Sequence, residues 1–449
     1  MNLELERMNR LLINTKSLCP VCLKTVDAQY VEENDAVYII KSCNLHGDFK
    51  TLAWKGKIKI QDWINHKNRV DIKNPLSEIK RGCPYDCGLC SEHRQTTCTA
   101  LIEVTNNCNL YCNFCFASAK DKELWEPTLK EIGFYFDRIK AQSGICNIQL
   151  SGGEPTVRDD LKDIIKIGKE KGFEFIQINT NGIRIGQDEN YLKELKEAGL
   201  SSIYLQFDGT IDSIYENIRG EKLLKEKINA INNCSKYNIG VVLVPVIIPK
   251  INDDNIGAMI DFALKNTPTV RGIHFQPVSY FGRIGFIPND QDRITLPEII
   301  EQIELQTKGL VKAENLKPAS CENSLCSFNG SFLYDDKKNL KPSSKREDTC
   351  SCNNIDAAEG AVKAKKFVSS NWKLETPTRT YKIESWDKLI NEIKSRKFSI
   401  SAMSFQDAYN VDIERIKDCC IHVVSKEGNL IPFCIYNITD TCGKSLYRT

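Results

Sequence analysis

The sequence predicts an α/β fold: a partial or complete (β/α) barrel with a small N-terminal metal-binding module and a C-terminal Cys-rich extension. The 449 residues suffice for two or three domains. Strand-like runs rich in Val, Ile and Phe alternate with amphipathic helical segments over residues 101–290, which indicates parallel strands joined by helices. The chain also carries 20 cysteines, many in tight groups, which is typical of metal sites in a reducing compartment.

Charge and hydropathy exclude several classes of protein. Lys and Arg number 61 against 59 Asp and Glu, a net charge of +2, so no basic field points to a nucleic-acid partner. The longest strongly apolar run, near residues 241–248, is too short to cross a bilayer. No secretory leader opens the sequence. We therefore expect a cytoplasmic protein.

Residues 1–80 predict a zinc-ribbon or rubredoxin-like module. Cys19 and Cys22 form one CxxC pair, and Cys43 with His46 forms a second pair 20 residues later. Short β-type segments at 36–41 and 49–54 frame the second pair. Thiolate and imidazole ligands suit tetrahedral Zn or mononuclear Fe, and the sequence leaves both metals open.

Residues 81–100 predict an auxiliary iron–sulfur loop. Four cysteines fall within 16 positions, with no room for a hydrophobic core between them: Cys83, Cys87, Cys90 and Cys98. Four thiolates would close a [4Fe–4S] cluster on all sides, as in an electron-transfer centre. A second zinc site is the alternative.

Residues 101–290 predict the barrel core. The predicted strands are 101–105, 147–150, 175–179, 202–207, 240–247 and 272–277. The predicted helices are 129–141, 158–171, 191–198, 211–238, which we expect to be broken, and 255–266. A parallel barrel carries its active site at the carboxyl ends of its strands. The remaining residues, 291–449, predict a less regular region with helices at 386–396 and 405–417 and scattered cysteines.

The chemistry is indicated by Cys108, Cys112 and Cys115, which follow the first predicted strand of the barrel. Three thiolates in a short loop can hold three irons of a [4Fe–4S] cube and leave the fourth open to a small chelating ligand. A ferredoxin-like electron carrier is the alternative, although a carrier needs no large α/β core.

The CxxxCxxC spacing, with Phe114 before the last cysteine, resembles the signature of the radical S-adenosylmethionine (SAM) superfamily. Cys83, Cys87 and Cys90 share that spacing, but only Cys108 follows a strand and precedes the turn 151–155, Ser-Gly-Gly-Glu-Pro, by one βα unit. The resemblance implies a barrel of the radical SAM type. It also implies that these residues contact SAM: Gly152, Gly153, Glu154, Pro155, Asn179, Asn181, Gln206, Asp208 and Gln276.

The order of the modules and the C-terminal stretch 405–437 are similar to one subgroup, which contains archaeal tetraether lipid synthase and proteins described as pterin methyltransferases. The resemblance implies a further auxiliary cluster beyond the barrel. Its candidate ligands are Cys321, Cys326, Cys419, Cys420 and Cys434.

Three functions remain open, the first two implied by the resemblance and the third from a different class of protein. The first is C–C coupling of lipid hydrocarbon chains through hydrogen abstraction from unactivated carbon, which predicts a long apolar groove and possible peripheral membrane contact. The second is radical methylation of a pterin-like small molecule, which predicts a compact pocket with convergent polar groups. The third is a multi-cluster electron-transfer protein. Reduced ferredoxin or flavodoxin is the expected electron donor, and no nucleic-acid partner is expected.

Overall fold

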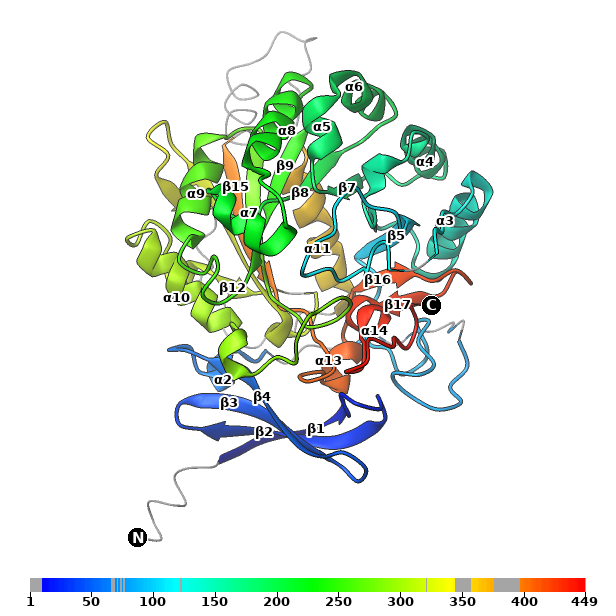
Figure 1. The fold of residues 1–449 in the computed structure, drawn as a ribbon, viewed down its shortest axis with the longest axis vertical. Coiled ribbons are helices and arrows are strands. Elements are labelled where there is room, and N and C mark those ends of the chain that lie inside the picture. Colours follow the sequence, from blue (N-terminus) through cyan, green and yellow to red (C-terminus); the bar gives the residue numbers. More distant parts are fainter. Residues whose placement is uncertain are drawn as a thin grey trace.

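A computed structural model describes residues 10–65, 69–70, 72, 75, 77–121, 123–319, 321–343, 357–374 and 396–448. These residues form a four-stranded sheet at the N-terminus and a 13-stranded sheet that carries the rest of the fold. Figure 1 shows the small sheet below the large one, with the helices α3 to α9 along the outside of the large sheet. The α/β architecture agrees with the prediction.

The four strands of the N-terminal sheet are antiparallel, and their order in the sheet is their order along the chain. It comprises β1 (Arg10–Leu18), β2 (Thr25–Glu33), β3 (Ala36–Cys43) and β4 (Gly47–Lys55), followed by the short helix α2 (Ile60–Trp63). The sequence indicated only the last two strands. The turn between β1 and β2 carries Cys19 and Cys22, whereas Cys43 and His46 lie at the turn between β3 and β4. The ribbon packs against α10 (Leu296–Gln306) and α13 (Ile413–Lys417).

Six parallel strands form the core of the large sheet, in agreement with the six predicted. They are β5 (Thr99–Thr105), β6 (Asn147–Gly152), β7 (Ile176–Thr180), β8 (Ser202–Gln206), β9 (Gly240–Val244) and β11 (Val270–Pro277). The two-residue strand β10 (Val246–Ile247) pairs with β11. Most side chains on both faces of these strands are buried, because the outer face is covered by helices and the inner face lines the barrel interior.

The connecting helices also follow the predicted order. They are α3 (Leu129–Ser143), α4 (Leu161–Glu170), α5 (Ile183–Gln187), α6 (Glu189–Glu197), α7 (Asp212–Arg219), α8 (Leu224–Lys236) and α9 (Ile256–Lys265). The expected break within 211–238 falls at Gly220, which ends α7 with φ of 85°. That left-handed conformation strongly favours glycine.

The C-terminal region extends the sheet at both edges. Strand β15 (Lys397–Met403) pairs in parallel with β11, and β16 (Ile421–Val424) pairs in parallel with β5. Eight parallel strands therefore follow one another without interruption from β16 to β15. Antiparallel strands continue the sheet beyond them: β12 (Lys317–Pro318), β13 (Ser327–Tyr334), β14 (Leu340–Pro342) and β17 (Leu430–Pro432), the last followed by α14 (Phe433–Asn437).

Of the two helices predicted in this region, 386–396 falls outside the described residues except for its last position. The other, 405–417, is helical only over α13. Residues before α13 are held in turns by the buried Asp407, which accepts from Tyr280 N at 2.9 Å and forms an ion pair with Arg293. These tertiary bonds replace the helical hydrogen bonds that the local sequence favours.

Helix α11 (Ala357–Trp372) lies inside the curve of the sheet and packs against β6, β9, β11 and β15 (Figure 1). Trp372 Nε1 donates to Ser399 Oγ at 3.2 Å, and Arg271 Nε donates to Asn371 O at 3.0 Å. These bonds lie at the amino ends of β15 and β11. The helix therefore closes the amino end of the barrel and leaves the carboxyl end for a site.

Candidate active site

The loop after β5 carries Cys108, Cys112 and Cys115, and contacts on both sides fix its backbone. Asn107 Oδ1 accepts from Cys108 N at 2.9 Å. Cys115 forms an isolated antiparallel bridge with Arg283, whose Nε donates to Cys112 O at 3.1 Å. All three cysteines line one large cavity in the barrel. A cluster that they hold would face the interior of that cavity.

The charges around this loop fit a group that binds through thiolates. Burial raises the pKa of the Cys108 thiol to about 12. Burial also raises the pKa of Cys112, an effect that the neighbouring Arg219 guanidinium opposes. Arg283 lies close enough to Cys115 to interact with it electrostatically. Bound iron deprotonates such thiols, and the two guanidinium groups can balance the negative charge of an iron–sulfur cluster.

The glycine pair at the end of β6 allows this strand to touch the cysteine loop. Gly152 has φ of 125°, and a Cβ added there would lie 2.1 Å from Thr105 O. A Cβ on Gly153 would lie 2.0 Å from Asn107 O. The close approach allows Gly153 N to donate to Thr105 O at 2.8 Å. Glycine is therefore required at both positions by the packing of β6 against the cysteine loop, in addition to the predicted contact with SAM.

The side chain of Glu154 ties the end of β6 to the end of β7. Its Oε1 accepts from Thr156 Oγ1 and Thr180 Oγ1, both at 2.6 Å. Its Oε2 accepts from Asn181 N at 2.7 Å. Both carboxylate oxygens therefore have protein partners. A contact of this turn with SAM, as predicted, would use its backbone.

Asp208 forms a buried ion pair with Arg219. The Arg219 Nε and Nη2 atoms donate to the two Asp208 oxygens at 2.7 and 2.9 Å, and Val246 N donates to Asp208 Oδ1 at 3.1 Å. Arg219 also reaches Phe114 O in the cysteine loop at 3.3 Å. The pair therefore connects the end of β8 to the cluster loop, and Asp208 acts in this structure by positioning Arg219.

The cavity has a volume of about 440 Å³ and runs along the inner face of the parallel strands. Its inward-facing residues include Thr99 and Leu101 of β5, Gln149 and Ser151 of β6, Asn179 of β7, Tyr204 and Gln206 of β8, Val244 of β9, His274 and Gln276 of β11, and Ser401 and Met403 of β15. Seven of the nine predicted SAM contacts line it, whereas Pro155 and Asp208 are not part of its wall. Strand alternation places these side chains on one face.

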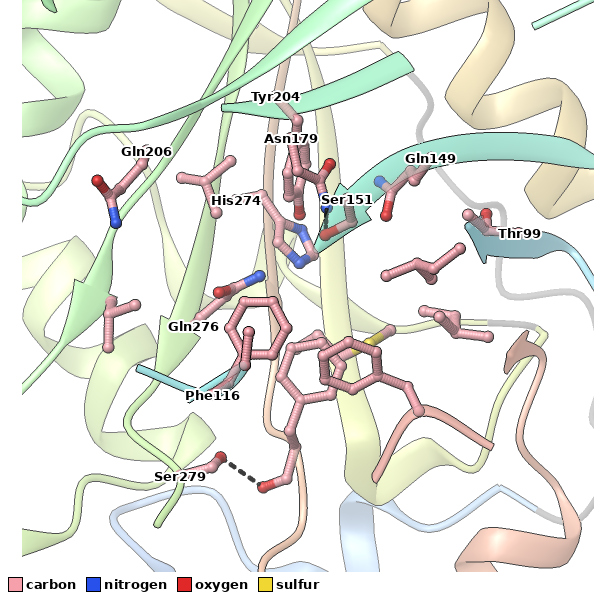
Figure 2. Close-up of a pocket in the computed structure, with 18 of the residues that line it drawn as sticks. Thr99, Phe116, Gln149, Ser151, Asn179, Tyr204, Gln206, His274, Gln276 and Ser279 are labelled. Atoms are coloured by element: carbon pink, nitrogen blue, oxygen red, sulfur yellow. Dashed lines mark hydrogen bonds between the residues drawn. The ribbon is translucent and has the colours of Figure 1, made fainter. Parts of the chain in front are cut away.

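One side of the cavity is polar and the other is aromatic. Figure 2 shows the side chains of Gln149, Ser151, Asn179 and His274 on the polar side, opposite a group of aromatic rings that includes Phe116. The rings pack around Phe433 in tilted and edge-on arrangements, with centroid distances of 4.4 Å to Phe405, 5.8 Å to Phe116 and 6.3 Å to Phe281.

Two polar groups of this cavity merit description. Asn179 Nδ2 donates to Ser151 Oγ at 3.4 Å, while Asn179 Oδ1 is buried without a hydrogen-bond partner in the described structure. An unpaired buried carbonyl oxygen is costly and fits a site that receives a donor from a ligand. His274 Nδ1 lies 2.8 Å from Ser401 Oγ, and burial lowers the pKa of His274 to about 4. His274 is therefore neutral at pH 7.

The remaining predicted metal ligands fall into separate groups. The Cys19, Cys22, Cys43 and His46 ligand atoms all lie within 4.8 Å of one another. The Sγ atoms of Cys98, Cys321 and Cys420 also lie within 4.8 Å of one another. They lie at the amino end of β5, whereas the loop of Cys108, Cys112 and Cys115 follows its carboxyl end.

Two further groups of thiols are present in the described part of the chain. The Cys83 thiol contacts Cys87, and Cys90 lies within electrostatic reach of Cys83. Cys326, Cys419 and Cys434 likewise interact electrostatically with one another. The number of auxiliary clusters and their ligand sets stay predictions.

Sequence analysis did not single out Lys227, although it is fully buried beside this site. Its Nζ donates to Asn181 O at 2.5 Å, and burial lowers its pKa to about 8. The inward-facing Gln149 was missed too. Both could have been found from polar residues at positions where the helix and strand periodicity predicts burial.

The fold and the site together define a class: an iron–sulfur enzyme on a parallel α/β barrel, with an open three-cysteine loop at the carboxyl end of its first strand. Comparison with known proteins extends this. The radical SAM superfamily model matches residues 102–263, and the HMPTM N-terminal zinc ribbon domain matches residues 11–55. The chain is 35% identical over 480 aligned positions to 7,8-dihydro-6-hydroxymethylpterin dimethyltransferase of Methanocaldococcus jannaschii, covering 94% of this chain and 93% of that protein. The chain belongs to the radical SAM superfamily.

Two more distant similarities each cover 48% of the chain. GTP 3′,8-cyclase of Clostridium perfringens (strain SM101 / Type A) is 29% identical over 48% of this chain and 65% of its own length. The solved structure of Streptococcus suis SuiB bound to S-adenosylmethionine covers 48% of each chain at 16% identity, with a TM-score of 0.38.

Membership establishes the cofactors in outline. The chain is a radical SAM enzyme that uses S-adenosylmethionine and iron–sulfur chemistry, and its N-terminal module is a zinc ribbon. The zinc-ribbon match favours Zn at the four-ligand group of the ribbon. No helix in the described part of the chain is both long and apolar enough to cross a membrane.

Proposed function

We propose that this enzyme carries out radical methylation of a pterin-like heterocycle, the second of the functions that the sequence suggested. The observation that carries the proposal is the cavity of about 440 Å³, in which amide side chains of four strands converge opposite aromatic rings. The name of the Methanocaldococcus relative, a pterin dimethyltransferase, supports the same substrate class.

The polar side of the cavity suits the edge of a pterin ring. Such an edge presents hydrogen-bond donors and acceptors side by side. Gln149, Asn179 and Gln276 each offer an amide with both a donor and an acceptor. Neutral His274 offers its Nε2, because its Nδ1 is paired with Ser401 Oγ. Asn179 Oδ1 would gain the partner that it lacks. The rings around Phe433 can pack against the faces of the heterocycle.

The protein contributes position and exclusion of water to the radical step. Bound SAM, given an electron from a reduced [4Fe–4S] cluster, would supply a 5′-deoxyadenosyl radical able to abstract a hydrogen atom from carbon. Cys108, Cys112 and Cys115 would hold the cluster, and the Gly152–Gly153 turn would place SAM against it. The Asp208–Arg219 pair fixes the loop that carries these thiols. Helix α11 closes the other end of the cavity.

An assay of the reconstituted protein under anaerobic conditions tests the proposal. We expect 5′-deoxyadenosine release with SAM and dithionite to rise several-fold when 7,8-dihydro-6-hydroxymethylpterin is added, with methylated pterin appearing by mass spectrometry. The variant Gln149→Leu, in the polar wall but outside the predicted SAM contacts, should lose the stimulation and retain the unstimulated release. Lys162→Ala, an exposed change on α4, is the matched control. Release that ignores the pterin, with no methylated product, would contradict the proposal.

A second candidate is the coupling of lipid hydrocarbon chains. The aromatic wall formed by Phe116, Phe281, Phe405 and Phe433 favours it, because an apolar chain could lie there. Deleting the gene and profiling acid-hydrolysed lipids separates the two functions. Loss of a species with the mass of two chains minus two hydrogens would support coupling; an unchanged lipid profile would support the pterin. Peripheral membrane contact belongs to this second candidate.

We further propose a reduced ferredoxin or flavodoxin as electron donor and a cytoplasmic location. The absence of a basic field argues against a nucleic-acid partner, since the net charge is +2. Purified ferredoxin and flavodoxin replacing dithionite in the release assay would test the donor. Failure of both to support release would contradict it.

A further inference from the structure

Three buried cysteines come together at the amino ends of β5 and β16. The Sγ atoms of Cys98, Cys321 and Cys420 all lie within 4.8 Å of one another, and the three residues are 4%, 2% and 3% exposed. Cys98 immediately precedes β5 and Cys420 immediately precedes β16. Cys98 N donates to Cys420 O at 2.8 Å, which fixes the two strand ends against each other. The thiols therefore meet on rigid elements.

The spacing of these thiols fits a single tetrahedral ion. Metal–sulfur bonds of about 2.3 Å place the sulfur atoms of a tetrahedral site about 3.8 Å apart. A [4Fe–4S] cube has an iron atom behind each thiolate and separates the sulfur atoms by about 6 Å. The Sγ–Sγ distances of the trio, all below 4.8 Å, are therefore closer to those of a tetrahedral mononuclear site than to those of a cube.

The same molecule contains an internal comparison for this spacing. Among the described residues, one other group of potential ligands is equally tight, and it is the four-ligand site of the zinc ribbon. Cys108, Cys112 and Cys115, the thiols expected to hold a cube, form no such group although all three are described. The distances between ligand atoms in the buried trio are therefore like those of the zinc-ribbon site and unlike those of the loop of Cys108, Cys112 and Cys115.

A candidate fourth ligand, Glu322, contacts one thiol of the trio, although its carboxylate is not within 4.8 Å of all three thiols and would have to turn towards a bound ion. Cys420 Sγ donates to Glu322 Oε2 at 3.6 Å. Glu322 is 9% exposed, and Ser327 Oγ donates to its other oxygen, Oε1. Carboxylate oxygen is a common ligand of tetrahedral zinc, and an outer hydrogen bond that orients the carboxylate is typical of such sites.

We propose that Cys98, Cys321, Cys420 and Glu322 bind one tetrahedral divalent ion, Zn²⁺ or Fe²⁺, in the wall of the substrate cavity. Cys98, Glu322 and Cys420 all line that cavity, at the end where α11 closes it. Lys363 and Ala364 of α11 line the same region, and Ala361 packs against the thiols. The ion would thus join β5, β16 and the segment before β13, beside α11, and would lie at the opposite end of the cavity from the loop of Cys108, Cys112 and Cys115.

Metal analysis of the full-length protein, purified without oxygen, tests this assignment. Wild-type protein should contain two mononuclear ions, one in the ribbon and one in the trio, in addition to its iron–sulfur clusters. Cys321→Ser should lose one mononuclear ion and retain its acid-labile sulfide. The matched control is Cys234→Ser, a buried cysteine on α8 outside all the thiol groups. X-ray absorption of the Cys43→Ser variant, which removes the ribbon ion, should then show three sulfur ligands and one oxygen.

Several outcomes would overturn the assignment. Loss of about four irons with their sulfide in Cys321→Ser would place the trio in a cluster. Unchanged metal content in that variant would show that the trio binds no ion. If the variant fails to fold, as judged by circular dichroism, the wild-type count decides: two mononuclear ions support the site and one overturns it. Glu322→Gln, which preserves size, should retain the ion but release it at least tenfold faster to a chelator.

Discussion

The two ends of strand β5 carry thiol groups with different origins. At the carboxyl end, Cys108, Cys112 and Cys115 lie within eight consecutive positions of one loop. At the amino end, Cys98 meets Cys321 and Cys420, which come from remote parts of the chain. The seven residues of β5 separate the two groups by about 23 Å. The comparison teaches that one strand can present a locally encoded site and a site that the fold assembles.

The largest expected effect is at the carboxyl end. Cys112→Ala removes one of the three ligands that leave an iron open for SAM, so 5′-deoxyadenosine release should fall below detection, by about 10³-fold or more. Measurement is by liquid chromatography after anaerobic turnover. Cys234→Ala is the control, because that buried thiol lies on α8, away from either end of β5. Substantial release by Cys112→Ala would remove the contrast between the two ends.

The second-largest effect is expected from removing the buried ion pair that holds the loop at the carboxyl end of β5. Arg219→Met leaves Asp208 buried and unpaired, and such a loss costs about 3–5 kcal/mol of unfolding free energy. Chemical denaturation of the two proteins measures it. Lys166→Met breaks the exposed pair with Asp163 and should cost less than about 0.5 kcal/mol. Equal losses in both variants would show that the buried pair has no special role in holding the loop.

The close contact between β6 and the loop gives a smaller effect. Gly153→Ala places a methyl group 2.0 Å from Asn107 O, so the loop must shift, at a cost of about 1–3 kcal/mol. We expect a lower melting temperature and a weaker visible absorption of the cluster. Gly285→Ala is the control, since a Cβ there meets nothing within 4 Å. A normal cluster spectrum in Gly153→Ala would show that this contact is dispensable.

Between the two ends lies the polar wall of the cavity. Asn179→Leu removes a buried carbonyl oxygen that has no partner, so the protein should gain stability by about 1 kcal/mol. The same change should lower kcat/KM about tenfold to a hundredfold, because the ligand loses a hydrogen-bonding group. Calorimetry and steady-state kinetics measure the two effects. A variant that is less stable than wild type would contradict the first part.

The last effect emerges only at acidic pH. The folded protein holds the pKa of His274 at about 4, below its ordinary value of about 6.5. The unfolded state therefore binds more protons between these values, and the stability due to neutral His274 is complete above pH 6.5 and falls as the pH drops towards 4. Urea unfolding at several pH values should show a shallower dependence in His274→Gln. Identical slopes in the two proteins would contradict this.

Local patterns in the sequence were sufficient for much of the fold. The six inner strands and the helices between them were predictable because strand alternation and helical periodicity are short-range signals. The exceptions came from long-range contacts. Strands β15 and β16 complete the parallel row from positions beyond 290, and the turn around Asp407 replaces a predicted helix because Arg293 and Tyr280 bind its carboxylate.

The candidate site divides in the same way. The positions of Cys108, Cys112 and Cys115 and of the Gly152–Gly153 turn follow from spacing along the chain. The function of Asp208 as a partner of Arg219 does not, because the two groups meet only when α7 folds back onto β8. Neither does the burial of Lys227 beside Asn181, which depends on the packing of α8 against the end of β7.

The sequence by itself determined the class of chemistry, because a CxxxCxxC loop after a strand brings its three thiols together through local chain geometry. It also predicted the metal site of the zinc ribbon, because its two ligand pairs lie in two turns of one small sheet. The tertiary structure alone decided which of the other cysteines are neighbours, since Cys98, Cys321 and Cys420 meet only after β16 pairs with β5 and the chain before β13 packs beside them. The physical reason is that a sequence predicts the distance between two ligands only where a short stretch of chain joins them. Where the ligands come from remote segments, the packing of the fold decides that distance.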